Sequence, residues 1–580
     1  MCGIAGLMTA DGSPAERTLL QAMTQAMAHR GPDGQGWHLD GDVGLAHCRL
    51  AIIDLVTGDQ PLFAPGDLAL VANGEVYNHV ELRASLSEVA FKTGSDCEPP
   101  LYLYQRHGLD FARHLRGMYA IALHDKAKGR LVLSRDPFGI KPLYWAESKA
   151  GFLFASEPQA ILATGLVERR LRPEGSLELL QLQFSTDPET PFAGIHRLLP
   201  GETVAVEKGR IVERRRIEAL PLVKNADPSL KALDRVLEES VSLHQRSDVP
   251  YGMFLSGGID SSALLALMAR LNSRPVLAFT ANFPGTDARD EAEHARELAR
   301  VTGAEHVEVP VTEGDFWTLL PEIAAAMDDP AADYAIVPTY KLAAEARKSV
   351  KVILSGEGGD ELFGGYGRYR AAMRPFFAKP MRRSGSFEGL GVLRDESRSW
   401  RDGFARDEAT AARGQGTKLQ KAQALDCMAW LPNDLLVKAD RCLMAHGIEG
   451  RVPFLDPEVA RFAYNLPDRL KVAKGQGKAL LRQWLAGTLP EAKPFSKKRG
   501  FTVPVAEWIA GRPELGALVA AQPGVQELCR PGSVEALFRA GGKQAGFAAW
   551  SLLFYALWHR RHLENRLPQG DVFETLSVKG

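Results

Sequence analysis

The sequence predicts an α+β sandwich of packed antiparallel sheets with flanking helices, followed by an α/β unit built on a parallel sheet. Up to residue 218, short apolar stretches are separated by Gly, Asp and Pro turns, which is typical of antiparallel strands. From residue 228 on, apolar strands alternate with helical patterns, which is typical of a parallel sheet covered on both faces. Because 580 residues are too many for one core, length predicts two to four domains, and the change in pattern places two of them, at 1–218 and 228–580.

In the first unit, the strand patterns are short and regularly interrupted. Helical patterns cover residues 16–29 and 79–87. The charged segment 207–218 predicts a last strand, and a linker is expected near 219–227. The earlier strands are expected within VGLAHCRLAIID (43–54), LALVANGEVYN (68–78), MYAIALHD (118–125), GRLVLSRD (129–136) and GFLFAS (151–156).

In the second unit, helices and strands alternate along the chain. Segment 367–430 is charged and Gly-rich without a clear period, so we expect a mobile loop there, and 381–420 has no interpretable pattern. The C-terminal part predicts mostly helices. The alternating elements are expected as helix 227–247, strand 249–256, helix 261–273, strand 276–283, helix 290–303, strand 306–311, helix 340–349 and strand 350–356.

Composition argues against several classes of protein. A net charge of −1 is unlike that of a nucleic-acid binder, and no apolar run approaches the roughly 18 residues of a membrane span. The N-terminus lacks a signal-peptide pattern. The cysteines contain no CxxC pair and fit a reducing cytoplasm better than a disulfide framework or a Cys-rich zinc site; they are Cys2, Cys48, Cys97, Cys427, Cys442 and Cys529. We therefore expect a cytoplasmic protein without nucleic-acid or membrane partners.

The position of Cys2 directly after the initiator Met suggests chemistry. Removal of Met1 would give one residue both a thiol and a free α-amine, which can act as nucleophile and base. The alternative is a small buried residue at the start of a strand, since free Cys packs as a small hydrophobic residue.

Two Gly-rich loops each follow a predicted strand. In FLSGGIDSS (254–262), Ser256, Gly257, Gly258 and Ser261 could cradle a pyrophosphate at a helix start, and Asp260 beside it makes sense if a metal bridges it to phosphate. The alternative is a Gly-rich turn with capping Asp and Ser. LSGEGGDELFGGY (354–366) adds more acids, which predict Mg²⁺ or a carboxylate base. Both loops should converge at the carboxyl edge of the sheet, where ligands bind.

Motifs in order along nearly the whole chain resemble the glutamine-dependent asparagine synthetase family. In that family a class II glutamine amidotransferase is fused to an ATP pyrophosphatase-type synthetase domain. The resemblance implies an Ntn-hydrolase-like αββα sandwich and an adenine nucleotide alpha hydrolase-like second domain. The motifs are MCGIAG, HRGPDGQG, RLAIID, NGEVYN, SDCE, SGGIDSS, SGEGGDELFGGY, DLLVKADRCLMAHGIEGRVPFLD, GKALLR and KRGFTVPVAEW.

The resemblance implies a glutaminase site in the first domain. Cys2 would attack the glutamine side-chain amide with its own α-amine as base, while Asn73 and Gly74 would stabilise the oxyanion. Arg49 would bind the α-carboxylate. The backbone of Leu50, Ala51, Ile52 and Ile53 would contact the substrate, and Glu75 and Asp96 would receive its α-ammonium. The alternative is that Arg49, Glu75 and Asp96 pair with one another as surface charges.

The resemblance also implies an ATP site with Mg²⁺ in the second domain. ATP would lie against Leu255, with adenine near Ala281, ribose near Ser355 and Gly356, and phosphates on the Ser256–Ser261 loop. Asp260 and Asp360 would hold Mg²⁺, and Lys478 would neutralise phosphate charge. Aspartate would react to β-aspartyl-AMP, and Glu357 would deprotonate the ammonia that arrives through an internal channel.

The acceptor is the least defined part of this prediction. Well-understood asparagine synthetases carry a Thr-x-x-Arg pattern where this chain has DDPAADYAIVPTYKLA (328–343), without Arg. The acceptor therefore stays open between aspartate and another carboxylate, such as a peptide or a glycan precursor. A non-catalytic binding protein is a further alternative, against which the intact motifs argue. The two prolines after SDCE can begin a helix, and a homodimer is common in the family.

Overall fold

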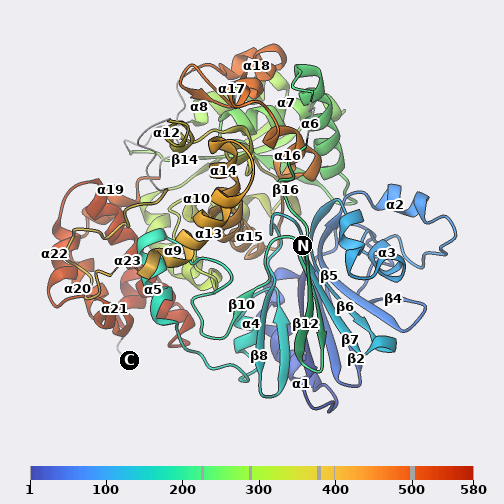
Figure 1. Cartoon of the computed structure of the whole chain (residues 1–580). Coiled ribbons are helices and arrows are strands. Elements are labelled where there is room, and N and C mark those ends of the chain that lie inside the picture. Colours follow the sequence, from blue (N-terminus) through green and yellow to red (C-terminus); the bar gives the residue numbers. More distant parts are fainter. Residues whose placement is uncertain are drawn as a thin grey trace.

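The computed structural model describes residues 2–223, 227–286, 291–374, 381–397, 399–496 and 503–578. It contains two units that lie side by side (Figure 1). The N-terminal unit, coloured blue to teal, is a β-sandwich, and the green-to-red remainder contains a second sheet and many helices. The N-terminus lies where the two units meet.

The N-terminal unit contains two six-stranded sheets, ordered β10-β8-β9-β1-β3-β2 and β12-β11-β7-β6-β5-β4. All neighbouring strands pair antiparallel. Along β1, Ile4 and Met8 pack between the sheets, whereas Ala5 and Leu7 pack on the opposite face with Leu20. The strands are β1 (Gly3–Thr9), β2 (Gly34–Asp40), β3 (Val43–Arg49), β4 (Leu62–Ala64), β5 (Leu68–Val76), β6 (Gly117–Asp125), β7 (Arg130–Arg135), β8 (Tyr144–Ser148), β9 (Gly151–Ala155), β10 (His196–Arg197), β11 (Glu202–Glu207) and β12 (Arg210–Arg216).

Helices cover both outer faces of this sandwich. Helices α1 and α4 contact the first sheet and α3 contacts the second, which gives the predicted αββα layers. Helix α3 begins at the two prolines after SDCE, as predicted. Helix α5 escaped prediction because Gly175–Leu182 is buried throughout and shows no amphipathic period. The helices are α1 (Arg17–Ala26), α2 (His79–Ser85), α3 (Pro99–His107), α4 (Pro158–Leu162) and α5 (Pro173–Leu182).

The second unit is built on a five-stranded sheet of order β15-β14-β13-β16-β17, and all its neighbours pair parallel. Val352 and Leu354 pack with Leu264 of α7 on one face, and Ile353 packs with Ile336 of α10 on the other. The predicted α/β architecture is confirmed. The elements are β13 (Tyr251–Phe254), β14 (Leu277–Asn282), β15 (Glu305–Pro310), β16 (Val352–Leu354), β17 (Glu449–Arg451), α6 (Leu230–His244), α7 (Ile259–Leu271), α8 (Ala292–Thr302), α9 (Glu313–Ala326) and α10 (Ile336–Ala346).

The mobile loop predicted for 367–430 is wrong for most of the segment that the structure describes. It contains α12 (Gly367–Ala372), α13 (Asp402–Arg413), α14 (Lys418–Leu425) and the start of the π-helix η5 (Asp426–Leu436). Helix α13 has a buried face with Gly403, Phe404 and Ala411, but this short pattern stands among charged residues and was not recognised. Helix α14 begins with a capping box between Thr417 and Gln420.

The remaining C-terminal part is mostly helical, as predicted. Residues 498–502 of the KRGFTVPVAEW motif lie outside the described residues. All six cysteines fall within the described ranges and are free, as their spacing predicts. In the described chain, no helix is long and apolar enough to cross a membrane. The elements are α11 (Gly359–Phe363), α15 (Val437–Met444), α16 (Pro457–Tyr464), α17 (Asp468–Lys471), β18 (Val472–Ala473), β19 (Gln476–Gly477), α18 (Ala479–Thr488), α19 (Val505–Ala510), α20 (Leu515–Ala520), α21 (Pro523–Leu528), α22 (Ser533–Arg539), α23 (Lys543–His562) and α24 (Val572–Ser577).

Candidate active sites

Cys2 is buried just before β1, between residues of both sheets of the sandwich. Its backbone N–H donates to Asn73 Oδ1 of β5 at 3.1 Å. Its Sγ donates to the carbonyl oxygen of Leu50, which follows β3, at 3.9 Å. Burial raises the pKa of the Cys2 thiol, so the thiol needs a base at close range to become a nucleophile.

Asn73 and Gly74 place amide groups beside this thiol. Asn73 is fully buried, and its Nδ2 has no hydrogen-bond partner among the described residues. Gly74 has φ +155°, and a Cβ there would clash with the Met118 carbonyl oxygen of the neighbouring strand β6. Only glycine therefore fits this position. A buried amide donor without a partner is what a developing oxyanion requires.

Arg49 ends β3 and leads into the Leu50–Ile53 segment. Its Nη1 pairs with Asp59 Oδ1 at 2.7 Å, and its Nη2 contacts the Asp54 carbonyl oxygen. Asp59 is 81% exposed, so a substrate carboxylate can replace this partner at little cost. The Ala51 N–H donates to Asp33 Oδ2 at 2.8 Å, which fixes the segment that follows Arg49.

Glu75 and Asp96 are both buried, and neither pairs with Arg49. Glu75 Oε1 lies 3.3 Å from Arg451 Nη2, while its Oε2 has no partner among the described residues. Burial, with Glu449 and Asp96 nearby, raises the pKa of Glu75 well above its usual value. Burial also raises the pKa of Asp96 to about 6. Glu75, Asp96 and Arg49 are therefore not surface charges that pair with one another. Two buried carboxyl groups close together favour a cationic ligand between them.

The two Gly-rich loops meet at the carboxyl edge of the parallel sheet, because β13 and β16 are adjacent and parallel. They face a cavity of about 360 Å³ and a neighbouring one of about 370 Å³. Every ATP, metal and base residue expected from the sequence lines one or both cavities: Leu255, Ser256, Gly257, Gly258, Asp260, Ser261, Ala281, Ser355, Gly356, Glu357, Asp360 and Lys478.

Lys478 links the two loops. Its Nζ pairs with Asp360 Oδ1 at 2.6 Å and also contacts Asp260 Oδ2. A Cβ at Gly359 would clash with the Asp260 carboxylate, and one at Gly365 would clash with Asp360 and Lys478. The glycines therefore leave the space in which two carboxylates and an ammonium gather. Paired carboxylates supply the hard oxygen ligands that Mg²⁺ prefers, so the donor set fits this ion.

Several lining residues were not predicted from the sequence. Asp333 and Tyr334 line the first cavity, within the 328–343 segment recognised only as the acceptor region. Lys438 of α15 also lines it, and its Nζ lies 2.9 Å from Asp333 Oδ2. Lys438 lies in the DLLVKADR motif (434–441), and the presence of this lysine in a family motif could have indicated a site residue.

An antiparallel sandwich with a buried near-terminal Cys, joined to a parallel-sheet unit with a Gly- and acid-lined cavity, defines a glutamine amidotransferase coupled to an ATP-using ligase. The glutamine amidotransferase domain family matches residues 1–216, and the asparagine synthase family, which implies ATP use, matches residues 232–560. The chain belongs to the glutamine-hydrolysing asparagine synthetase family.

Related proteins match over most of their length. A provisionally named asparagine synthetase of Mycobacterium tuberculosis is 35% identical, with 98% of each chain covered. Asparagine synthetase 1 of Bacillus subtilis is 32% identical, also with 98% of each covered. Asparagine synthetase B of Escherichia coli is 30% identical over 89% of this chain and 85% of its own.

Proposed function

We propose that the protein is a glutamine-dependent asparagine synthetase, with its glutaminase in residues 1–218 and its synthetase in 228–580. Glutamine is hydrolysed at Cys2, and the ammonia passes inside the protein to the second site. There ATP activates aspartate as β-aspartyl-AMP with release of pyrophosphate, and ammonia displaces AMP. The observation that carries the proposal is the buried Cys2 held by Asn73 Oδ1, with the Asn73 Nδ2 donor beside it unused within the described chain.

In the glutaminase half, Cys2 Sγ attacks the side-chain carbonyl carbon of glutamine. The α-amine freed by removal of Met1 takes the thiol proton and passes it to the departing ammonia. Asn73 Nδ2 and the Gly74 N–H donate to the oxyanion. Water then hydrolyses the γ-glutamyl thioester to glutamate. The buried carboxyls of Glu75 and Asp96 support the expected site for the α-ammonium.

In the synthetase half, the Ser256–Ser261 loop holds the phosphates, while Leu255 and Ala281 flank the adenine. Asp260 and Asp360 would hold Mg²⁺, which when bound neutralises phosphate charge. Lys478 supplies a further cation to the departing pyrophosphate. Glu357, which lines the same cavity, takes a proton from the attacking ammonia.

The acceptor defines a second candidate function, in which the same chemistry acts on a peptide or glycan carboxylate. The 328–343 wall supplies Asp333 and Tyr334 to the cavity and contains no Arg, unlike the Thr-x-x-Arg pattern. This composition leaves room for an acceptor other than aspartate.

The test is pyrophosphate release by the purified protein with MgATP and glutamine, with and without aspartate, together with amino-acid analysis. Aspartate-dependent pyrophosphate matched by asparagine is the expected result. Glutamate release without aspartate-dependent pyrophosphate rejects aspartate and directs the search to a panel of peptide and glycan carboxylates.

A further inference from the structure

Arg30 is completely buried and lies between Cys2 and the synthetase unit. Its Nε donates to the Cys2 carbonyl oxygen at 3.2 Å. Its terminal nitrogens form a bidentate pair with Asp440, at 2.8 Å from Nη1 and 3.0 Å from Nη2. Nη1 also donates to Glu157 Oε1 at 2.8 Å. One guanidinium thus joins the backbone of Cys2 to a carboxylate of the other unit.

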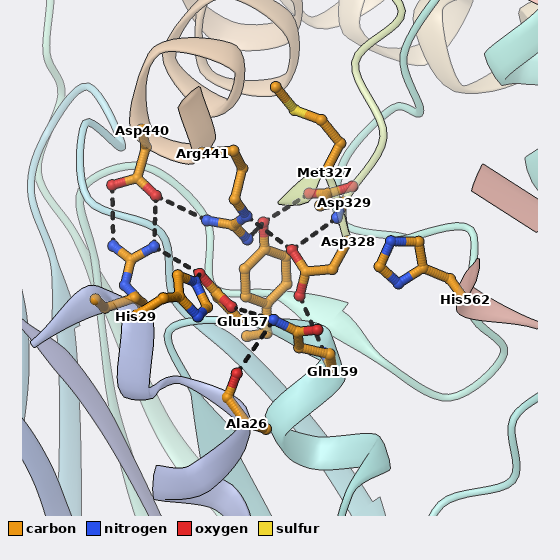
Figure 2. A network of polar contacts seen from close by, with 12 residues as sticks. Ala26, His29, Glu157, Gln159, Met327, Asp328, Asp329, Asp440, Arg441 and His562 are labelled. Carbon is orange, nitrogen blue, oxygen red and sulfur yellow. Dashed lines mark hydrogen bonds and ion pairs between the residues drawn. The ribbon is translucent and has the colours of Figure 1, made fainter. Parts of the chain in front are cut away.

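Asp440 lies on α15 of the synthetase unit, 410 positions after Arg30. Its Oδ2 also accepts a hydrogen bond from Arg441 Nη1 at 2.8 Å, and Arg441 Nε donates to Asp328 Oδ1 at 2.7 Å. Figure 2 shows this buried network running from Asp440 through Arg441 to Asp328. The same helix carries Lys438, which lines the ATP-side cavity. Helix α15 therefore contributes residues toward both sites.

The Arg30–Asp440 pair remains charged over a wide pH range. Burial lowers the pKa of Arg30, but Asp440 and Glu157 outweigh this effect, so the pKa is raised. Burial raises the pKa of Asp440, but Arg30 outweighs that effect, so the pKa is lowered. The bidentate geometry fixes the plane of the guanidinium and with it the direction of Nε toward Cys2.

The anchoring of Cys2 matters because this residue would carry both reactive groups. Removal of Met1 would leave no residue on its amino side. Its position would then depend on β1 after it and on its contacts with Asn73 and Arg30. A small rotation of Cys2 would move the thiol and the α-amine together, away from the glutamine amide.

We propose that Asp440 of the synthetase unit is a positioning residue for the glutaminase nucleophile and acts through Arg30, which holds the Cys2 carbonyl oxygen. This inference rests on the proposed role of Cys2 as the nucleophile. The glutaminase site is then completed by the synthetase unit, although Asp440 itself does not touch the reacting atoms.

The test compares Asp440→Asn with Asp456→Asn in the full-length protein. Both changes keep the side-chain shape and remove one buried carboxylate that forms a bidentate pair with an arginine of the N-terminal unit, but Asp456 pairs with Arg116 rather than Arg30. We expect Asp440→Asn to lower the glutaminase kcat by about 10- to 100-fold, because small displacements of reacting groups are costly. KM for glutamine should change less, and alkylation of Cys2 by a chloroketone analogue of glutamine should slow in parallel. Asp456→Asn should keep kcat near wild type.

Ammonia-dependent pyrophosphate release tests whether each variant is folded. Arg30→Lys keeps the charge but cannot serve both Asp440 and Cys2, so it should also lower kcat. The double variant should be no slower than Arg30→Lys alone, since both residues act through one contact. If Asp440→Asn folds poorly, Arg30→Lys alone still decides the matter, because an unchanged kcat in that variant overturns the inference.

Three further results would overturn the positioning role: a wild-type kcat in Asp440→Asn, equal losses in Asp440→Asn and Asp456→Asn, or additive losses in the double variant. Cys2→Ala separates this outcome from failure of the proposed function. Glutaminase activity that survives Cys2→Ala removes the nucleophile itself. Activity lost in Cys2→Ala but kept in Asp440→Asn removes the positioning role alone.

Discussion

The ammonium of Lys478 lies between Asp260 and Asp360, which come from the loops after two neighbouring parallel strands. Burial lowers the pKa of Lys478, but the two carboxylates outweigh this effect, so the pKa is raised and the group stays charged. The cation balances two acids that would otherwise repel each other. Triphosphate oxygens would compete for this ammonium, and the released carboxylates could then bind Mg²⁺.

Asp260→Asn should therefore block ATP chemistry without disabling the glutaminase. The change would remove a proposed ligand for Mg²⁺ and removes one of the two acids at Lys478, so pyrophosphate release should fall by about 100-fold or more, as for other lost electrostatic contacts in active sites. Glutamate release from glutamine, measured in the same samples, is the control for folding. Unchanged pyrophosphate release would exclude Asp260 from the ATP site.

Cys2→Ala should abolish the use of glutamine and leave ammonia-dependent synthesis intact, because the proposed function assigns the two half-reactions to different units. Cys48→Ala is a matched control: Cys48 is a buried thiol on β3, opposite Gly3 in the β1–β3 pair, and burial raises its pKa to about 12. It should keep glutaminase activity. Product analysis with glutamine and with ammonium salts gives both readouts. Loss of ammonia-dependent synthesis in Cys2→Ala would contradict the two-site arrangement.

The parts of both sites that lie close in sequence could be predicted. The loops at 254–262 and 354–366 each follow an apolar strand, and the rule that parallel strands share a carboxyl edge brings them together. The residues that complete the sites lie far away along the chain. Lys478 meets Asp260 across 218 positions; the family resemblance indicated a phosphate-neutralising role for this lysine, but not this contact. Asp440 meets Arg30 across 410 positions, and no local pattern indicates that pair.

The errors in secondary structure have a related cause. Local patterns indicate helices when one face is apolar and the other is polar. Helix α5 has almost no exposed face and so shows no such contrast, whereas the buried face of α13 is short and lies among charged residues. The position of α5 is therefore set by tertiary packing rather than by a recognisable period, while the amphipathic pattern of α13 was hidden by the charged, Gly-rich sequence around it.

Asn73→Ala should lower the glutaminase kcat by about 100- to 1,000-fold, the usual loss for a removed oxyanion donor, with a smaller effect on KM. The change removes Nδ2 and also the Oδ1 that holds the Cys2 N–H. Asn78→Ala is the matched control, since Asn78 bonds the backbone of His114 and Arg116 in the same unit. A proportional rise in KM with an unchanged kcat would instead assign Asn73 to ground-state glutamine binding.

Acidic pH should weaken glutamine binding through Asp96. Because burial raises the pKa of this carboxyl to about 6, it is ionised near pH 7 and becomes protonated as the pH falls through 6. Only the ionised carboxylate would attract the α-ammonium of glutamine, so KM for glutamine should rise as the pH falls below 6.

Asp96→Asn resembles the protonated state and should give a high KM that varies little between pH 5 and 8. The measurement is glutaminase KM across this range for both proteins. A wild-type KM that stays flat through pH 6, or an Asp96→Asn variant that keeps the wild-type pH dependence, would remove Asp96 from the ammonium site.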